Sequence, residues 1–127
     1  MTRGKMVFGA KPKSIDLLIF PDSTNAPTFK STGGVKSVAR SAAGKFLVTL
    51  QDPYRKLRGV HATYNTAADN VDLYAQGGVV SNEGTTSPVT VVVKLKTGAT
   101  NTDAAAADPD NFISVMIDFE DSAAYGT

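Results

Sequence analysis

The sequence consists of short apolar runs that are separated by turn-forming residues about every 8–15 positions. In Val89–Lys96 the residues Val89, Val91, Val93 and Leu95 occupy every second position. A period of two places such side chains on one face of a β-strand. No segment shows a helical period of any length. We therefore expect an all-β protein.

Eight segments have the length and composition of strands. The sequence predicts strands at Ser14–Phe20, Thr28–Lys30, Val35–Arg40, Lys45–Gln51, Leu57–Tyr64, Val71–Gln76 (continued by Val79 and Val80), Val89–Lys96 and Phe112–Glu120. The segment Pro21–Pro27 is predicted to be a loop, and Gly77–Gly78 a bulge. The pattern indicates an antiparallel β-sandwich or jelly roll of about seven to eight short strands, or a small barrel.

The chain has the length of one domain with one core. We predict that this domain spans residues 14–127 and that residues 1–13 form an extended basic arm, with Met6–Phe8 as its apolar anchor. In Leu57–Tyr64, alternation would place Leu57 and His61 on the same face. The predicted core consists of Phe46, Val48, Leu50, Val91, Val93, Val115, Ile117 and Phe119.

The composition excludes several kinds of catalytic site. The chain has no Cys, which rules out a disulfide framework, a thiolate metal site and a Cys nucleophile, and it has a single His, His61. A Ser-His-Asp site with Asp69 or Asp72 lacks the GxSxG motif, and His61 falls within a predicted strand. We therefore expect neither an enzyme nor a cofactor.

Two groups of carboxylates have a weak chemical signal. Asp103, Asp108 and Asp110 supply oxygen atoms of the kind that bind Ca²⁺, but the spacing is not that of an EF-hand. We expect a solvated acidic loop there and no metal site. Asp118, Glu120 and Asp121 would partly share a face, but the chain has no Trp to support glycoside hydrolysis.

Neither a membrane span nor a signal peptide is expected. The longest apolar runs, Leu17–Phe20 and Val91–Val93, are far shorter than the roughly 20 residues that cross a bilayer. The basic start Met1–Lys5 has no apolar segment behind it. We therefore expect no membrane partner.

Charge is distributed unevenly along the chain. Residues 1–64 contain eleven Lys and Arg and three Asp, a net charge of +8, whereas residues 65–127 contain two Lys and nine acidic residues, a net charge of −7. Either the fold interleaves the two halves, or it presents two opposed charged faces. Opposed faces would suit association between protein molecules, whereas the acidic half argues against nucleic-acid binding.

The order of the segments resembles that of a known class of virion protein. The segments are Gly44–Leu50, Tyr54, Val60–Ala62, Ser87–Val91 and Phe112–Ile117. Over roughly residues 40–120 this layout is similar to that of the small β-sandwich decoration, or cement, proteins of tailed-phage capsids. The resemblance implies a non-enzymatic protein, commonly trimeric, that clamps neighbouring major capsid subunits. It contains no catalytic motif, so it assigns no functional residue.

Our hypothesis is therefore a structural phage protein that decorates and stabilises the capsid. It would be made in the host cytoplasm and bind the major capsid protein on the virion surface as a homotrimer. The densest basic cluster, Arg55–Arg58 next to Tyr54, spans the start of the predicted strand Leu57–Tyr64. The predicted partner-binding residues are Arg3, Lys5, Phe8, Lys11, Lys13, Tyr54, Arg55, Lys56 and Arg58.

Two alternatives remain open at this level. One is a phage tail component, a tail-tube or adaptor subunit, in which a long loop such as Asn101–Asn111 clasps the next ring. The other is a carbohydrate-binding β-sandwich module. Such a module needs a row of exposed aromatic side chains, for which the chain has no Trp and four Tyr, namely Tyr54, Tyr64, Tyr74 and Tyr125.

Overall fold

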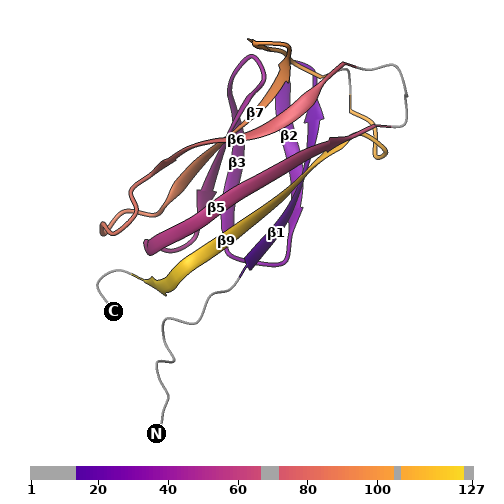
Figure 1. The fold of residues 1–127 in the computed structure, drawn as a ribbon. Coiled ribbons are helices and arrows are strands. Elements are labelled where there is room, and N and C mark those ends of the chain that lie inside the picture. The colour runs from indigo at the N-terminus through magenta and orange to yellow at the C-terminus, as the bar shows by residue number, and fades with distance from the viewer. Residues whose placement is uncertain (1–13, 67–71, 105–106, 125–127) are drawn as a thin grey trace, which may run out of the picture.

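The computed structural model describes residues 14–66, 72–104 and 107–124, and their regular structure is entirely β-strand (Figure 1). The strands are β1 (Ser14–Asp22), β2 (Asn25–Ser31), β3 (Val35–Ala42), β4 (Lys45–Leu50), β5 (Tyr54–Asn65), β6 (Tyr74–Ser81), β7 (Thr90–Thr97), β8 (Thr100–Asn101) and β9 (Phe112–Ala124). Within these ranges no helix is long and apolar enough to cross a membrane.

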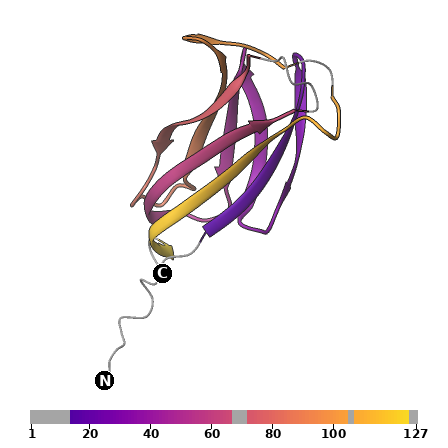
Figure 2. The same cartoon turned by 45° about the vertical axis from the view of Figure 1, so that its right-hand side comes forward.

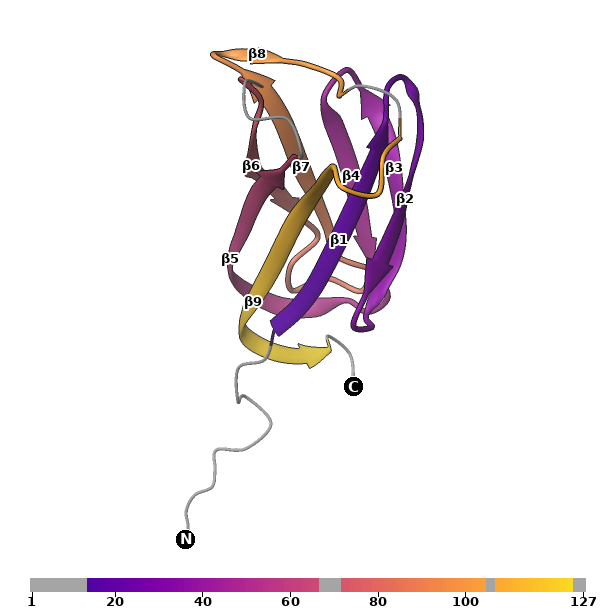
Figure 3. The same cartoon turned by 90° about the vertical axis from the view of Figure 1, so that its right-hand side faces the viewer.

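The strands form two antiparallel sheets that lie face to face (Figure 2, Figure 3). The four-stranded sheet has the order β2-β1-β9-β5. The five-stranded sheet has the order β3-β4-β7-β6, and the short β8 pairs with β7. This arrangement confirms the predicted all-β antiparallel sandwich.

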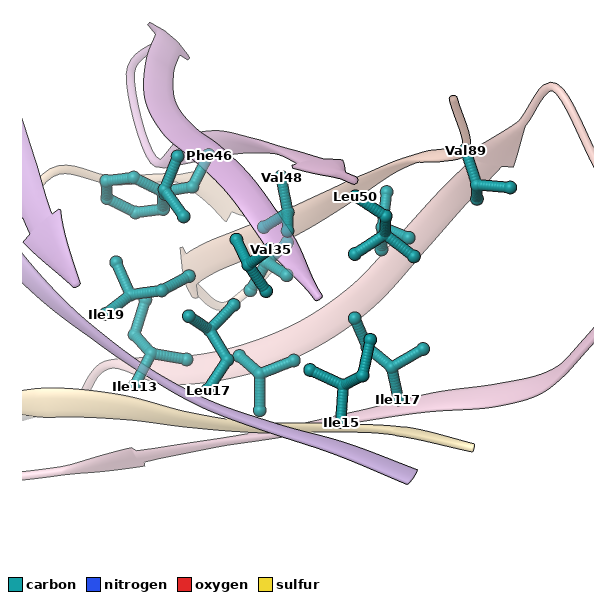
Figure 4. Packing of buried hydrophobic residues seen from close by; sticks show 14 of the residues in the cluster. Ile15, Leu17, Ile19, Val35, Phe46, Val48, Leu50, Val89, Ile113 and Ile117 are labelled. Carbon is teal, nitrogen blue, oxygen red and sulfur yellow. The ribbon is translucent and has the colours of Figure 1, made fainter. Parts of the chain in front are cut away.

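Alternating side chains of both sheets fill the space between them. Figure 4 shows Phe46, Val48 and Leu50 of β4 facing Leu17 of β1 and Ile113 of β9. Each fully buried aliphatic side chain of this kind contributes roughly 1.5–3 kcal/mol through the hydrophobic effect. The eight predicted core residues are all buried, namely Phe46, Val48, Leu50, Val91, Val93, Val115, Ile117 and Phe119.

The predicted loop Pro21–Pro27 is wrong in extent. Strand β1 continues to Asp22 and β2 begins at Asn25, so only two residues connect them. The register shifts between Phe20 and Asp22, which places Pro21 at a bulge. A bulge tolerates proline because the missing N–H is not needed for a ladder hydrogen bond.

A bulge also corrects the predicted facing of β5. Leu57 is buried in the core, whereas His61, predicted on the same face, is exposed. The register shifts between Leu57 and Gly59, and a bulge of this kind moves the following residues to the opposite face. The strand is also longer than predicted, since it begins at Tyr54 rather than Leu57.

Other boundaries also differ from prediction. The long loop considered at Asn101–Asn111 begins with the last residue of β8, and Ala104 within it is buried. Residues 105–106 lie outside the described residues. The last strand continues to Ala124 rather than ending at Glu120. The predicted bulge at Gly77–Gly78 is confirmed by the register shift there.

Each edge strand of the sandwich pairs irregularly with its neighbour. Register shifts occur in the β1–β2, β3–β4, β5–β9 and β6–β7 pairs, whereas the central pairs β1–β9 and β4–β7 are regular. Irregular edges are poor templates for a further strand. The outer faces of the two sheets are therefore more regular than their edges.

Two glycines in turns provide a test of the packing. Gly44 and Gly98 have similar positive φ angles of 63° and 59°. A Cβ on Gly44 would lie 2.4 Å from the Leu95 carbonyl oxygen, whereas a Cβ on Gly98 would meet no atom within 4 Å. We expect Gly98→Ala to cost about 1–2 kcal/mol in unfolding free energy through backbone strain. Gly44→Ala should cost about 1–3 kcal/mol more through overpacking.

Urea unfolding of the two variants measures this difference directly. Because the two φ angles are nearly equal, backbone strain should lower the stability of both variants by the same amount. The difference between their unfolding free energies then reports the contact of the new Cβ at Gly44. Equal losses in the two variants would contradict the packing at Gly44.

Candidate functional site

The structure locates only part of the predicted partner-binding set. The basic arm, residues 1–13, lies outside the described residues, so its proposed contacts stay a prediction. These residues are Arg3, Lys5, Phe8, Lys11 and Lys13. The other four predicted residues belong to the edge strand β5.

Tyr54 has a structural role in β5. Its side chain is buried, and its ring lies 4.5 Å from that of Phe119, measured between ring centroids. Its hydroxyl donates to Asp52 at 3.4 Å. Burial, followed by the charge of Asp52, raises the pKa of the Tyr54 hydroxyl. The ring is therefore part of the core and does not present a surface to a partner.

The three cations predicted next to Tyr54 are exposed. One of them has an acidic neighbour, since Lys56 Nζ lies 3.8 Å from Glu83 Oε1. Glu83 also accepts a hydrogen bond from the Leu57 amide through Oε2. Arg55 and Arg58 have no ion pair among the described residues. The predicted cluster is thus a set of exposed cations on an edge strand, with one of them partly neutralised.

The two oppositely charged halves of the sequence interleave in space. Strand β9, which contains Asp118 and Glu120, lies between β1 and β5 of the basic half. The ion pairs Arg40–Asp103 and Lys56–Glu83, and the contact between His61 and Asp118, each join one half to the other. The position of a residue in the sequence therefore does not decide which charged surface it belongs to.

Asp103 anchors the segment that follows β8. Its carboxylate accepts hydrogen bonds from Arg40 Nε at 3.0 Å and Nη2 at 2.7 Å, and from the Gly44 amide at 3.0 Å. The bidentate bond from Arg40 and the amide bond hold the pKa of Asp103 below its ordinary value, although partial burial opposes this. Further along, the Ala107 amide donates to Asp22 at 3.0 Å.

These contacts bear on the acidic cluster noted in the sequence. Asp103 is engaged by Arg40, and Asp108 accepts a hydrogen bond from the Asp110 amide at 2.8 Å. In the part of the chain that the structure describes, no three His, Cys, Asp or Glu side chains gather as metal ligands. The contacts of Asp103 and Asp108 are those of side chains that hold a turn together.

His61 belongs to a polar row across β1, β9 and β5. Its Nε2 lies 3.4 Å from Asp118 Oδ2, and the hydroxyl of Ser14 donates to Asp118 Oδ1 at 2.7 Å. Among the described residues, the carboxylate beside His61 is that of Asp118 and not that of Asp72. Asp69, the other candidate considered from the sequence, lies outside the described residues. A Ser nucleophile needs an imidazole as its base, but here the hydroxyl donates to a carboxylate. This row binds the strands to one another and lacks the geometry of acyl transfer.

Charge is segregated by sheet. The strands of the five-stranded sheet contain no Asp or Glu, and their cations are Lys36, Arg40, Lys45, Lys94 and Lys96. The strands of the four-stranded sheet contain acidic and basic residues in mixture. Arg40 lies opposite the core residue Phe46 and pairs with Asp103, whereas Lys45, Lys94 and Lys96 lie on the outer side of the sheet. The charged residues on the outer face of these strands are therefore all cations.

Three lysines lie together at one end of this surface, and we call them the lysine face (Lys45, Lys94 and Lys96). Lys45 of β4 lies directly opposite Lys94 of β7, and Lys96 follows two positions along β7. Lys96 Nζ is 3.5 Å from Gln76 Oε1. None of the three has an ion pair with a described residue. The alternation of the sequence indicated that Lys94 and Lys96 face outward, but the pairing of β4 with β7 is needed to place Lys45 beside them.

The Asp103 anchor predicts a pH-dependent stability. Because the folded pKa is lowered, the contribution is complete above the ordinary value of about 3.9 and is lost as pH falls through the folded pKa. Asp103→Asn should therefore be less stable than the wild type at neutral pH, and the difference should shrink below about pH 4. Urea midpoints at several pH values measure it, and a difference that stays constant with pH would contradict the assignment.

The opposed lysines predict a stabilising charge reversal. Like charges directly opposite on a sheet are destabilising, and opposite charges contribute roughly 0.2–1 kcal/mol. Lys94→Glu should convert the Lys45–Lys94 repulsion into an ion pair and raise the free energy of unfolding by about this amount. The gain should diminish in high salt. Lys94→Gln, which removes the charge only, should gain less than Lys94→Glu.

Comparison with known proteins does not supply a function. No family model matches the chain, and no curated protein or solved structure matches it significantly. The resemblance to phage decoration proteins therefore remains one of layout. What the protein does is inferred from its own surfaces.

Proposed function

We propose that this protein is a non-catalytic structural component of a tailed-phage particle, which decorates the capsid and stabilises it by binding the major capsid protein. The observation that carries the proposal is the lysine face, where Lys45 and Lys94 oppose one another without a carboxylate in the strands of that sheet. In the isolated protein this repulsion lowers the free energy of unfolding, and no carboxylate in the strands of the sheet compensates it. An acidic partner surface would relieve it on binding.

The architecture suits an adhesive role. The described buried side chains are apolar, and the two sheets form one continuous core. Such a sandwich keeps its shape when it binds. On a capsid, identical copies would pack around a symmetry axis as trimers, and each copy would bury a limited area. Linked contacts raise the effective concentration of the next one, so many weak contacts stabilise a shell together.

The two alternatives receive less support from the surface. Of the tyrosines that the structure describes, Tyr54 is buried, Tyr64 is partly buried and Tyr74 is exposed, which is no row of aromatic rings for a sugar. The segment proposed to clasp a neighbouring tail subunit is held to its own sandwich through Asp103 and Ala107. Neither feature favours a carbohydrate module or a tail ring.

Binding to phage heads tests the proposal. The full chain is mixed with expanded heads assembled from the major capsid protein of the same genome, and co-sedimentation is measured at low and high salt. We expect saturable binding that weakens at high salt, together with a higher melting temperature of the heads. Absence of binding, combined with rings or tubes formed by the protein alone, would contradict capsid decoration and favour a tail component.

Light scattering at two concentrations tests the expected oligomer. A discrete trimer supports self-association before the capsid is reached. A strict monomer would contradict the trimer in solution and would require assembly on the capsid lattice itself.

A further inference from the structure

We infer that the outer face of the five-stranded sheet is the docking surface, and that its partner is a protein surface with an apolar centre and carboxylates along one side. This inference rests on the proposed function, because it names the surface and the partner chemistry through which decoration would occur. It follows from the arrangement of three rows of side chains across the strands.

The middle row is apolar and partly exposed. Ala39 of β3 lies opposite Leu47 of β4, which lies opposite Val92 of β7. Val79 extends the row into β6, where the bulge between Gly77 and Val80 leaves it 60% exposed. Val79 lies in the bulge between the residues that pair with Val93 and Val91, so it adds a fourth apolar residue at the level of Val92, and we call these four residues the apolar strip.

The apolar strip has cations on one side and hydroxyls on the other. The row two positions away contains Lys45, Lys94 and Gln76, and Lys96 lies beyond it. On the opposite side lies a row of small hydroxyl side chains, which consists of Ser37, Thr49, Thr90 and Ser81. The face therefore has a direction, since a partner with carboxylates on one side fits in one orientation only.

This arrangement favours a protein over a nucleic acid. Protein interfaces have an apolar centre with polar and charged groups at the rim. Protein surfaces that bind nucleic acid instead have cations along the path of the phosphates, together with aromatic rings that stack on the bases. Here the lysines are confined to one end, and Tyr74, the exposed aromatic residue beside them, has its hydroxyl bonded to the Gly98 carbonyl.

The face is also unsuited to a second copy of itself. Its strands contain no acidic residue, so a symmetric dimer through this face would bring no carboxylate to the lysines. The edge strands offer no regular alternative, because the pairs β3–β4 and β6–β7 are both interrupted by register shifts. The charges therefore favour binding of this face to an acidic surface of a different protein. Under the proposed function, that protein is the major capsid protein.

Charge reversal on the two sheets tests the inference. The double variant Lys45→Glu/Lys94→Glu places two acidic residues on the proposed face, and Lys30→Glu makes the same type of change on the outer side of the other sheet. Binding to heads is measured by co-sedimentation over a range of protein concentrations. We expect binding by the double variant to weaken at least about tenfold, and binding by Lys30→Glu to change less than about twofold.

A second variant tests the apolar strip without a change of charge. Val79→Ser alters an exposed side chain, so the fold should be unaffected while binding weakens severalfold. Lys94→Glu alone is the most informative single change, because it should keep or raise the melting temperature while it weakens binding. Loss of binding then cannot be attributed to unfolding.

The outcomes separate the two proposals. If the wild type does not bind heads, capsid decoration is overturned and this inference falls with it. If the wild type binds and the lysine variants bind equally well, only the docking surface is overturned. Lysine-dependent binding to duplex DNA, measured by fluorescence anisotropy, would contradict a protein partner. A change of oligomeric mass in the lysine variants would identify a second copy as the occupant and would likewise overturn the inference.

Discussion

The strict alternation of β4 and β7 is the constraint on which the rest of the molecule depends. Phe46 and Val48 pair with Val93 and Val91 and point into the core. Because the side-chain period of a strand is two, a slip of one residue would expose all of these side chains together. The same register forces Lys45 and Lys94 outward and opposite each other. The stability of the core and the charge of the outer face therefore arise from a single pairing.

Local patterns predict the core well and the facing of residues near bulges poorly. Burial of an alternating run such as Val115–Phe119 follows from its period alone. The bulge between Leu57 and Gly59 has no comparable local signal, and it reverses the facing expected for His61. The loop expected at Pro21 fails for a related reason, since a bulge accommodates the proline within β1.

The candidate site could be read from the sequence only in part. The charge count by sequence halves indicated an asymmetry, but the fold assigns charge by sheet, and β9 brings acidic residues among the basic strands. Outward lysines on Val89–Lys96 are visible from alternation, whereas Lys45 joins them through a contact between distant segments. Tyr54 illustrates the converse, because an aromatic residue within a basic cluster suggests a contact surface, yet its ring completes the core against Phe119.

The two sheets differ in whether their strands contain charges of both signs, and this difference favours one of them as the surface where a partner binds. On the four-stranded sheet, Asp118 is bonded by Ser14 and lies beside His61, so its charge is used within the fold. On the five-stranded sheet, Lys45 and Lys94 repel each other and no carboxylate within the sheet compensates them. A glutamate at either position is expected to stabilise the isolated domain, because opposite charges directly across a sheet attract. Two opposed lysines are a less stable combination for folding than a lysine and a glutamate. Their presence on this surface is therefore better explained by binding to a partner than by folding.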